Sequence, residues 1–502
     1  MLATSSCPPR RAVEVTAVET TKTYHEIDFL LPAQRFNINF SYITQKGLPF
    51  VREFVLRLVH LAPMTKSQIA TYFGFSRRET EEAITDLVER DELTLTESGR
   101  LTLTEKSSGY FTDIGEVPRL SLLRDSGVRL SFDLATFTCL GKDIAAEKWK
   151  AGIQIKVDDD NAARSEAHVE MHFQRQFNEI LHKGYLPKSL VQDEKDSPTV
   201  YTVNAVNKIR QIPLRLTVKF QVDMDGRSVE REDFEVLKSS DTVHERIAVE
   251  LDHLARPSNS MDIAKAMLEI GDGDTLKLFD SRTSSLKLQF FDDLVKLESN
   301  SKKGRTTFLG PIYSQENWGR LQRLLAPLLK SRIESKTDVS QDTFVWLAPS
   351  DPYWCKSNRL IVSLSDFLNK ASTKEKSLYS PVIYLPINGS DDFRAVRQWK
   401  QELDPYTDRA HGIVEGFLGG NVEVMFLKGE LAVVVYHMSL PDMYPVTLPL
   451  GFISDDPKTV SIIEKLATTY IQGTSGFERP NDCGLLSRFG KNEGERKTPP
   501  IA

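Results

Sequence analysis

The chain has 502 residues, with 64 Lys and Arg against 70 Asp and Glu, which gives a formal net charge of −6. Hydrophobic residues make up 40% and charged residues 27% of the sequence, so a collagen-like or wholly disordered chain is excluded. The mildly acidic balance argues against a protein that coats nucleic acid along its whole length, but it leaves room for a local nucleic-acid site. At roughly 150 residues per domain, this length suggests about three domains.

The cysteines Cys7, Cys139, Cys355 and Cys483 lie far apart and form no C-x-x-C pair. This spacing is untypical of structural zinc sites, and a chain that can bury a large core has little need of a disulfide scaffold. The N-terminal residues lack the apolar run of a signal peptide, and the most apolar short run, 431–436, is far below the ~20 residues that cross a bilayer. We therefore expect a cytoplasmic protein without a membrane segment.

Composition divides the chain into several predicted segments. Residues 1–20 and 473–502 are polar, or rich in Gly, Pro and charge, and are expected to be disordered. Between them we expect a first domain over 21–110, a mixed α/β middle domain over 111–255 and an α/β domain over 256–472. The predicted fold class is therefore a multidomain α+β or α/β protein.

Residues 50–108 carry the most regular pattern in the sequence. A first helix is expected to end before Pro63, and its apolar stripe consists of Phe54, Val55, Leu58 and Val59. Thr65 is a candidate N-cap for a second helix over 66–73, which Gly74 ends. Ser76 is the candidate N-cap of a third helix and forms a capping box with Glu79. The buried side of this third helix is expected to consist of Ala83, Ile84, Leu87 and Val88.

A predicted hairpin follows the third helix. Leucines at 93 and 95, and again at 101 and 103, alternate with threonines on either side of Glu97-Ser98-Gly99. Three helices followed by a hairpin is the element order of a winged helix-turn-helix, and the stretch resembles winged-helix domains of the MarR and related prokaryotic regulator type. The resemblance covers about 60 of the 502 residues and is specific to the fold rather than to one family.

The resemblance implies a DNA-binding face. In winged-helix domains the first residues of the third helix enter the major groove, and the hairpin tip contacts the adjacent backbone. The positions that would face base edges are Arg77, Arg78 and Thr80. The positions that would contact phosphate are Lys66 and Ser67 at the start of the second helix and Arg100 in the hairpin.

The charge of residues 50–108 keeps a second kind of partner open. Eight Lys and Arg stand against ten Asp and Glu there, a net charge of −2, and Glu79, Glu81 and Glu82 flank the two arginines. Because DNA binding requires phosphate neutralisation, this module alone predicts weak and strongly salt-dependent binding. Winged helices also serve as protein-docking modules, so duplex DNA and other protein subunits of the same system are both candidate partners.

The remaining elements follow from hydrophobic periodicity. Helices are predicted at 169–181, 262–270, 321–329 and 457–470. Pro327 is expected to kink or shorten the third of these helices. Strands are predicted at 214–222, 344–347, 359–362, 382–385, 422–426 and 431–436. Asp225-Gly226 predicts a hairpin turn after the first strand, and Lys428-Gly429-Glu430 joins the last two.

Two polar groupings in the middle domain favour solvated surface over metal sites. His168 and His172 lie four residues apart on one predicted helix face, which can hold zinc, but the zincin order is His-Glu-x-x-His and no third ligand is evident. The acids at 158–160 can bind a divalent ion, although a charged loop is the commoner outcome. We therefore predict no metal and no cofactor.

A third grouping bears on nuclease chemistry. Lys219 with Asp223 and Asp225 is similar to the lysine and acids of a nuclease strand. Alternation, however, places Lys219 on one strand face with Arg215 and Thr217, which is typical of a solvated strand. We assign no catalytic residue.

Residues 419–466 loosely resemble the C-terminal part of a phospholipase D-like domain, in which a His-x-Lys strand leads to a second strand, a Gly-Phe-Ile strand and a closing helix. The sequence departs from that pattern because Phe426 stands two residues before Lys428, where the histidine belongs, and the second motif is absent. Because that chemistry needs a histidine nucleophile on phosphorus, the resemblance implies a degenerate fold without hydrolysis. A generic α/β domain is the alternative.

A regulator-like module fused to a long body without motifs is similar in layout to accessory components of bacterial multi-gene anti-phage defence systems. The sequence thus predicts a non-catalytic DNA-recognition or scaffold component of a bacterial multiprotein system. The alternatives are a transcriptional regulator, or an enzyme that acts as a metal-dependent nuclease or degenerate phosphodiesterase.

Overall fold

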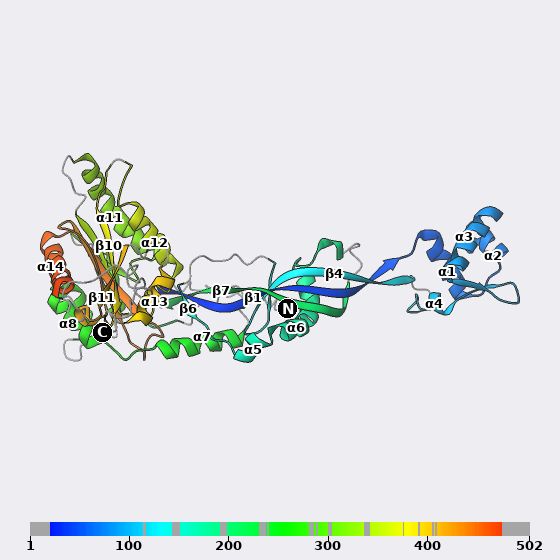
Figure 1. Cartoon of the computed structure of the whole chain (residues 1–502), viewed down its shortest axis with the longest axis horizontal. Helices are drawn as coiled ribbons and strands as arrows, with labels where there is room; N and C mark the ends of the chain where they lie inside the picture. Colours follow the sequence, from blue (N-terminus) through cyan, green and yellow to red (C-terminus); the bar gives the residue numbers. More distant parts are fainter. Residues whose placement is uncertain are drawn as a thin grey trace, which may run out of the picture. The chain divides into compact units, whose positions relative to one another are not determined.

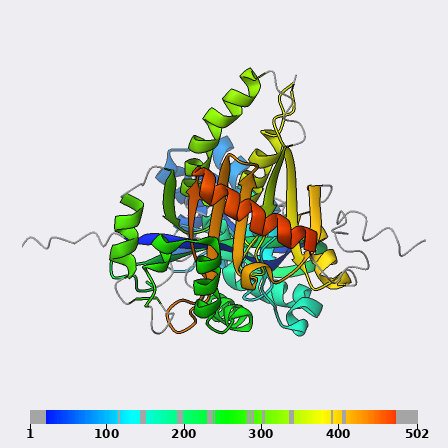
Figure 2. The same ribbon diagram turned by 90° about the vertical axis from the view of Figure 1, so that its left-hand side faces the viewer.

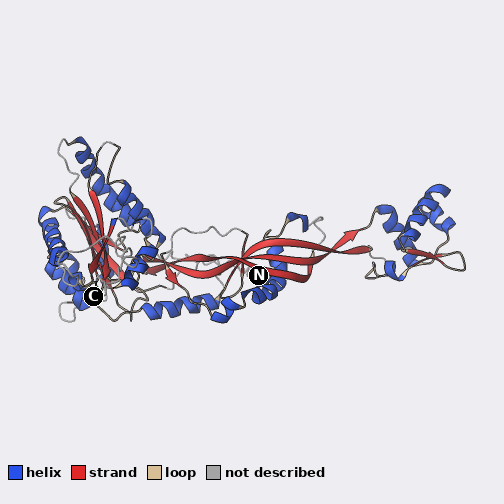
Figure 3. Ribbon diagram, in the orientation of Figure 1, coloured by secondary structure: helices blue, strands red, loops and turns tan. Residues whose placement is uncertain are grey.

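The computed structural model describes residues 21–113, 117–142, 151–190, 198–229, 237, 240–280, 286–287, 290–299, 304–335, 342–374, 376–389, 392–403, 406 and 409–473. Helices and sheets are mixed in it, which confirms the expectation of a multidomain α+β protein at this coarse level (Figures 1 and 3). Of the ends expected to be disordered, 1–20 and 473–502, all residues but Gly473 lie outside the described residues, and Gly473 is the last residue of a helix. Within the described ranges, no helix combines the length and the apolar character that crossing a bilayer requires.

The chain forms two compact units, and both are discontinuous in sequence. Unit 1 comprises Met1–Leu31, Glu147–Lys156 and Arg215–Ala502, and unit 2 comprises Pro32–Ala146 and Val157–Leu214. Two long strands, β1 (Lys22–Gly47) and β7 (Thr199–Val222), contribute residues to both units.

Unit 2 contains a sheet covered by one long helix. Strand β1 pairs antiparallel with β4 (Arg119–Asp133), and β4 pairs with the short β5 (Cys139–Gly141). Helix α6 (Ser165–His182) packs on this sheet through the predicted apolar stripe, in which the Phe173 ring lies 5.1 Å from the Phe40 ring of β1. The shorter elements are α5 (Asp159–Ala163) and η1 (Lys188–Leu190).

Residues 48–111 of unit 2 form a separate apolar cluster, which we call the helix–hairpin module. Its elements are α1 (Phe50–Leu61), α2 (Lys66–Phe73), α3 (Arg77–Glu89), β2 (Leu93–Leu95), β3 (Leu101–Leu103) and α4 (Glu105–Ser108). The predicted helices and hairpin are thus confirmed. The core contains Ile84 and Leu87 as expected, together with Ile69, whereas Val88 is 44% exposed, which corrects its predicted place on the buried side.

Unit 1 is built on a mixed sheet. In sequence order its strands are β8 (Arg305–Leu309), β9 (Thr343–Leu347), β10 (Ser380–Ile387), β11 (Ala410–Val414), β12 (Val422–Leu427), β13 (Leu431–Met438) and β14 (Leu448–Ser454). In space they are ordered β11-β10-β9-β12-β13-β14-β8, with β9, β10 and β11 parallel and the others antiparallel to their neighbours. Besides this sheet, the short β6 (Ile153–Gln154) pairs with β1.

Helices cover both faces of this sheet. The helices of unit 1, in sequence order, are α7 (Asp241–Leu254), α8 (Ser260–Ile270), α9 (Gly273–Leu276), α10 (Phe290–Ser299), α11 (Gln315–Glu334), α12 (Asn358–Asn369), α13 (Phe393–Glu402), η3 (Phe417–Gly419) and α14 (Pro457–Gly473), and not all of them lie on the sheet. Figure 2 shows α14 crossing the face of the sheet toward the viewer. Helices α11 and α12 bury their apolar sides in a core with strand residues such as Trp346 and Val433.

Two predictions in unit 1 are wrong. Residues 359–362 form the first turn of α12 rather than a strand, because Leu360, Leu364 and Phe367 recur at helical spacing beyond that short run. The shortening expected at Pro327 does not occur, because helix α11 continues through this residue, whereas the alternative of a kink there stays a prediction. Pro327 lies on the exposed side, where water can satisfy the freed carbonyl, while buried Leu325 and Leu329 hold both halves on the core.

Candidate nucleic-acid interface

Helix α3 begins where local signals place it. Gly74 ends α2 with a φ of 70°, a left-handed conformation that glycine adopts without strain. The Ser76 side chain accepts a hydrogen bond from the Glu79 backbone N–H, and the Ser76 N–H donates to the Glu79 carboxylate at 2.8 Å. These bonds fix the start of the helix, so Arg77 and Arg78 occupy its first two positions.

Both arginines point away from the protein body into solvent. The Arg77 side chain is 93% exposed and the Arg78 side chain 87%. Arg77 lies 3.5 Å from Glu81, and Arg78 donates from Nε to Glu82 at 2.9 Å, each one helical turn further on. Exposed ion pairs of this kind contribute little and are screened by salt, so the two guanidinium groups can exchange a carboxylate for an incoming anion.

The three residues predicted to contact phosphate, Lys66, Ser67 and Arg100, are exposed too. Lys66 and Ser67 open α2, which is capped by a hydrogen-bonded box between Thr65 and Gln68. Arg100 lies at the base of the hairpin turn, where its backbone carbonyl accepts from the Thr96 N–H at 2.8 Å and its side chain donates to the Pro63 carbonyl. These residues share the surface of the helix–hairpin module with the start of α3.

Thr80 corrects the predicted set. Its side chain is only 4% exposed, and its hydroxyl donates a hydrogen bond to the Ser76 carbonyl at 2.9 Å. A buried hydroxyl that back-bonds within the helix cannot reach a base edge. Helical geometry is the reason, because Thr80 follows Ser76 by four residues and lies on the same side of α3 as the buried Ile84 and Leu87.

The sequence did not single out one exposed aromatic side chain on this surface. Tyr72 of α2 is 69% exposed, whereas the neighbouring Ile69 is buried and Phe73 is half-buried. The signal was present in the sequence, because Tyr72 falls outside the i, i+4 stripe that Ile69 and Phe73 make. Together with exposed Leu95 in the hairpin, it gives the module apolar as well as basic contacts.

A second convergent group lies buried in unit 1, and the sequence did not reveal it. His437 of β13 is fully buried between two carboxylates, with Nδ1 2.9 Å from Asp351 Oδ2 and Nε2 3.0 Å from Glu423 Oε2. Ionised carboxylates only accept hydrogen bonds, so both ring nitrogens must donate and the ring is an imidazolium. Burial alone lowers the pKa of His437, but the hydrogen bonds to Asp351 and Glu423 outweigh it and raise the pKa to about 9.

This ionic centre is closed by further donors. The indole N–H groups of Trp346 and Trp354 donate to Glu423 Oε1 at 2.7 and 3.0 Å, and the Thr447 hydroxyl donates to Asp351 Oδ2 at 2.9 Å. Burial raises the pKa of Asp351, but the hydrogen bond from His437 reverses that effect and leaves the pKa lowered. Both carboxylates contact the one imidazolium and the histidine is inaccessible, so the arrangement has a structural role rather than offering a reactive group.

The middle-domain groupings differ from their predictions. The rings of His168 and His172 pack against Phe137, with centroids 4.8 and 5.5 Å away, so they do not form a freely solvated face. The acids at 158–160 begin helix α5 instead of forming a loop, a position that the helix dipole favours. Among the residues that the structure describes, no three His, Cys, Asp or Glu side chains are placed to hold a metal ion.

The predicted solvated strand face of β7 is confirmed at Thr217 and Lys219, which are exposed, but is wrong at Arg215, whose side chain is 6% exposed. Arg215 donates to the buried carboxylate of Asp28 at 2.9 Å, and the Thr217 hydroxyl donates to the same group at 2.6 Å. The backbone N–H of Asn358 is a third donor to Asp28. Arg215 and Thr217, which share a strand face with Lys219, therefore have a structural role, because the buried carboxylate of Asp28 requires charged and hydrogen-bonding partners.

The phospholipase D-like resemblance stays a prediction. Lys428 lies exposed in the turn between β12 and β13, and Phe426 is buried in β12. No protein-family model matches the chain, and no curated protein matches it either.

Proposed function

We propose that the helix–hairpin module is a winged helix-turn-helix and that it docks the protein onto duplex DNA. The observation that carries this proposal is the exposure of Arg77 and Arg78 in the first turn of α3. In that fold the same positions lead the recognition helix into the major groove, where a guanidinium group pairs with guanine edges or phosphate. Arg100 and Lys66 add two positive charges beside it.

The proposal assigns the protein a recognition role within a bacterial multiprotein system, and anti-phage defence is the system whose component layout it is most similar to. In such a component the small module binds DNA and the rest of the chain holds other subunits there. Unit 1, which contains most of the chain, would have this second role. The proposal also places the protein in the cytoplasm, where bacterial duplex DNA is found. The first alternative, a transcriptional regulator, would make the same DNA contact. The second, an enzyme, would require a catalytic group, and the proposal assigns none.

Replacing Arg77 and Arg78 together with alanine is expected to weaken binding of a random-sequence duplex by about tenfold or more. It should also lower the slope of log K against log salt by about 2, because each arginine neutralises about one phosphate. Fluorescence anisotropy with a labelled duplex at two salt concentrations measures both effects.

The matched control is Arg90→Ala with Lys106→Ala, which removes the same charge from the other end of α3, where Lys106 donates to the Arg90 carbonyl. Binding by this control should stay within about twofold of wild type at equal salt. Equal loss in both double variants would show that net charge acts without a defined face, and equal binding by all three proteins would remove α3 from any DNA interface.

A second candidate, docking of a protein subunit, is favoured by the exposed Tyr72 and Leu95 and by the net acidity of residues 50–108. Apolar and aromatic side chains are enriched at the centres of protein interfaces. The anisotropy experiment separates the two candidates. If the module docks only on protein, the wild-type chain should bind duplex as weakly as the Arg77→Ala/Arg78→Ala variant does.

A further inference from the structure

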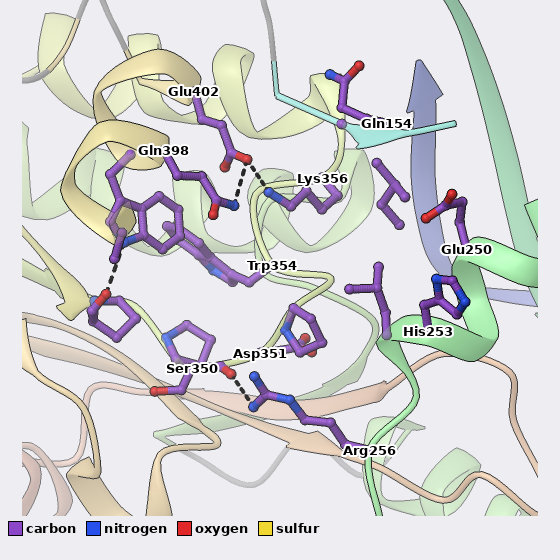
Figure 4. A pocket seen from close by; sticks show the side chains of 18 of the residues that line it. Gln154, Glu250, His253, Arg256, Ser350, Asp351, Trp354, Lys356, Gln398 and Glu402 are labelled. Atoms are coloured by element: carbon purple, nitrogen blue, oxygen red, sulfur yellow. Dashed lines mark hydrogen bonds and ion pairs between the residues drawn. The ribbon is translucent and has the colours of Figure 1, made fainter. Parts of the chain in front are cut away.

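Unit 1 contains a cavity of about 570 Å³ beside helix α13 (Figure 4). This volume lies within the range of small-molecule sites. Its walls come from β6, from the end of α7, from the segment after β9 and from α13, all within unit 1. The DNA contacts proposed above use none of these residues, so the cavity is available for a separate ligand.

One wall of the cavity holds a buried carboxylate that is only half satisfied. Oε1 of Glu402 accepts hydrogen bonds from the ammonium group of Lys356 and from Nε2 of Gln398, as Figure 4 shows. Oε2 of Glu402 is buried as well, yet it has no hydrogen-bond partner in the part of the chain that the structure describes. A buried acceptor without a donor is destabilising, so a donor from an occupant of the cavity would remove that penalty.

An aromatic ring lies beside this carboxylate. Trp399 precedes Glu402 on α13 by three residues, is half-buried and lines the cavity. Its indole N–H donates to the Pro386 carbonyl at 2.9 Å, so the ring rather than the N–H is left for an occupant. Pro349 and Pro352 add apolar walls. The combination favours an occupant that is flat and rich in N–H donors.

The ionised side chains that line the cavity indicate the charge of that occupant. The ionised side chains that line the cavity are Lys156, Arg256 and Lys356 against Glu250, Asp351, Glu402 and Glu415, which leaves one negative charge in excess. Behind Asp351, the imidazolium of His437 is balanced by Glu423. In Figure 4, Arg256 lies at the opposite end of the cavity from Glu402, where it donates to the Ser350 carbonyl at 2.6 Å. Lys356 already pairs with Glu402 at that end, so the features that suit a cationic donor are the unpartnered Oε2 of Glu402 and the excess of one negative charge over the cavity lining as a whole.

We propose that this cavity binds a guanidinium group that stacks on Trp399 and donates a hydrogen bond to Oε2 of Glu402. A guanidinium group is planar, carries five N–H donors, stays ionised and stacks on aromatic faces, whereas an ammonium group offers no flat face. A small guanidino compound and an arginine side chain of a peptide share this chemistry, and the experiment below distinguishes them.

The test measures binding of defined probes to the full chain by saturation-transfer NMR titration. Ethylguanidinium is compared with ethylurea, its neutral isostere, and N-acetylarginine methylamide is compared with the corresponding citrulline compound. Each guanidinium probe is expected to bind at least about tenfold more tightly than its urea partner, because a charge-assisted hydrogen bond to a carboxylate contributes roughly 1.5–3 kcal/mol. Tighter binding of the capped arginine than of ethylguanidinium identifies a peptide source, and equal binding identifies a small guanidino compound.

Variants tie the binding to the named residues. Glu402→Gln removes the acceptor charge but leaves Lys356 buried without its partner, so Lys356→Met with Glu402→Gln serves as a second variant that removes both charges together. Trp399→Leu removes the stacking ring. Each variant is expected to weaken ethylguanidinium binding at least about tenfold. Glu316→Gln on the exposed side of α11 makes the same charge change elsewhere and should bind as wild type does.

The outcomes are decisive in both directions. Preference for guanidinium over urea that disappears in the Glu402 and Trp399 variants supports the site. Equal binding of guanidinium and urea probes overturns it, as does unchanged binding in the Lys356→Met/Glu402→Gln variant with a wild-type circular dichroism spectrum. Absence of saturable binding by all probes to the wild-type chain overturns it as well.

Discussion

Replacing His437 with glutamine should lower the free energy of unfolding of unit 1 by about 3–5 kcal/mol. The imidazolium is the only cation in contact with Asp351 and Glu423 among the ion pairs described for these carboxylates, and all three side chains are buried. A glutamine amide is neutral, so two carboxylates would stay buried without a counter-charge. Urea unfolding followed by tryptophan fluorescence measures the loss, because the tryptophans among the described residues, Trp318, Trp346, Trp354 and Trp399, all lie in unit 1.

Two further variants make this result specific. His253→Gln changes an exposed histidine of α7 in the same way and should shift stability by no more than about 0.5 kcal/mol. Combining His437→Gln with Asp351→Asn and Glu423→Gln removes the whole buried charge set, so it should recover part of the loss. A His437→Gln protein that unfolds at the wild-type urea concentration would contradict the assignment of His437 as the buried cation.

The same centre predicts a pH dependence. Because its carboxylate partners raise the pKa of His437 from 6.5 to about 9, the folded state holds the proton more tightly than the unfolded chain. The resulting stabilisation, on the order of 3 kcal/mol, is complete below pH 6.5 and falls as the pH rises through 9. His25 nearby stays neutral in this window, since burial lowers its pKa to about 4.

Urea unfolding of wild type and His437→Gln at several pH values between 6 and 10 tests this dependence. Burial also raises the pKa of Cys355, so both proteins lose some stability at the alkaline end. The difference between them isolates His437 and should shrink as the pH rises. A difference that stays constant across the range would mean that His437 is neutral when folded.

The sequence predicted the helix–hairpin module well because its signals are local. Thr65, Gly74 and Ser76 act on backbone groups within three or four residues, and each cap lies where its residue type placed it. Exposure of a single side chain is less predictable from type alone. Thr80 looked suitable for a base contact, but its position four residues after Ser76 turned it toward the core.

The ionic centre shows what the local pattern omits. Glu423 and His437 are charged residues within strands that are otherwise apolar, and a charge in a fully buried strand requires a partner. That signal was present, but the partner Asp351 follows β9, which reaches β12 only through the order of the sheet. Likewise, residues 147–156 belong to unit 1 although the segments before and after them belong to unit 2. Dividing the sequence into consecutive domains could not predict that the segments of the two units alternate along the chain.

Replacing Gly451 with alanine should cost about 3 kcal/mol of the free energy of unfolding of unit 1. Gly451 lies in β14 between β13 and β8, directly opposite Phe308. A Cβ atom at this position would lie 2.5 Å from the Val434 carbonyl oxygen and 2.7 Å from the Phe308 ring, and Phe308 is fully buried, so neither neighbour can give way.

The same substitution at Gly319 is the matched control for Gly451→Ala, measured by the same urea unfolding. Gly319 lies inside α11, and no atom of the surrounding protein lies within 4 Å of the place where its Cβ would be. Alanine there should leave stability unchanged or raise it by up to about 1 kcal/mol, because alanine has the higher helix propensity. If both variants unfold at the wild-type urea concentration, the close approach of β14 to Val434 and Phe308 is not present in solution. If Gly451→Ala alone is destabilised, the lack of space around residue 451 is the cause, rather than the change from glycine to alanine as such. β14 then packs against Val434 and Phe308 as closely as the structure shows.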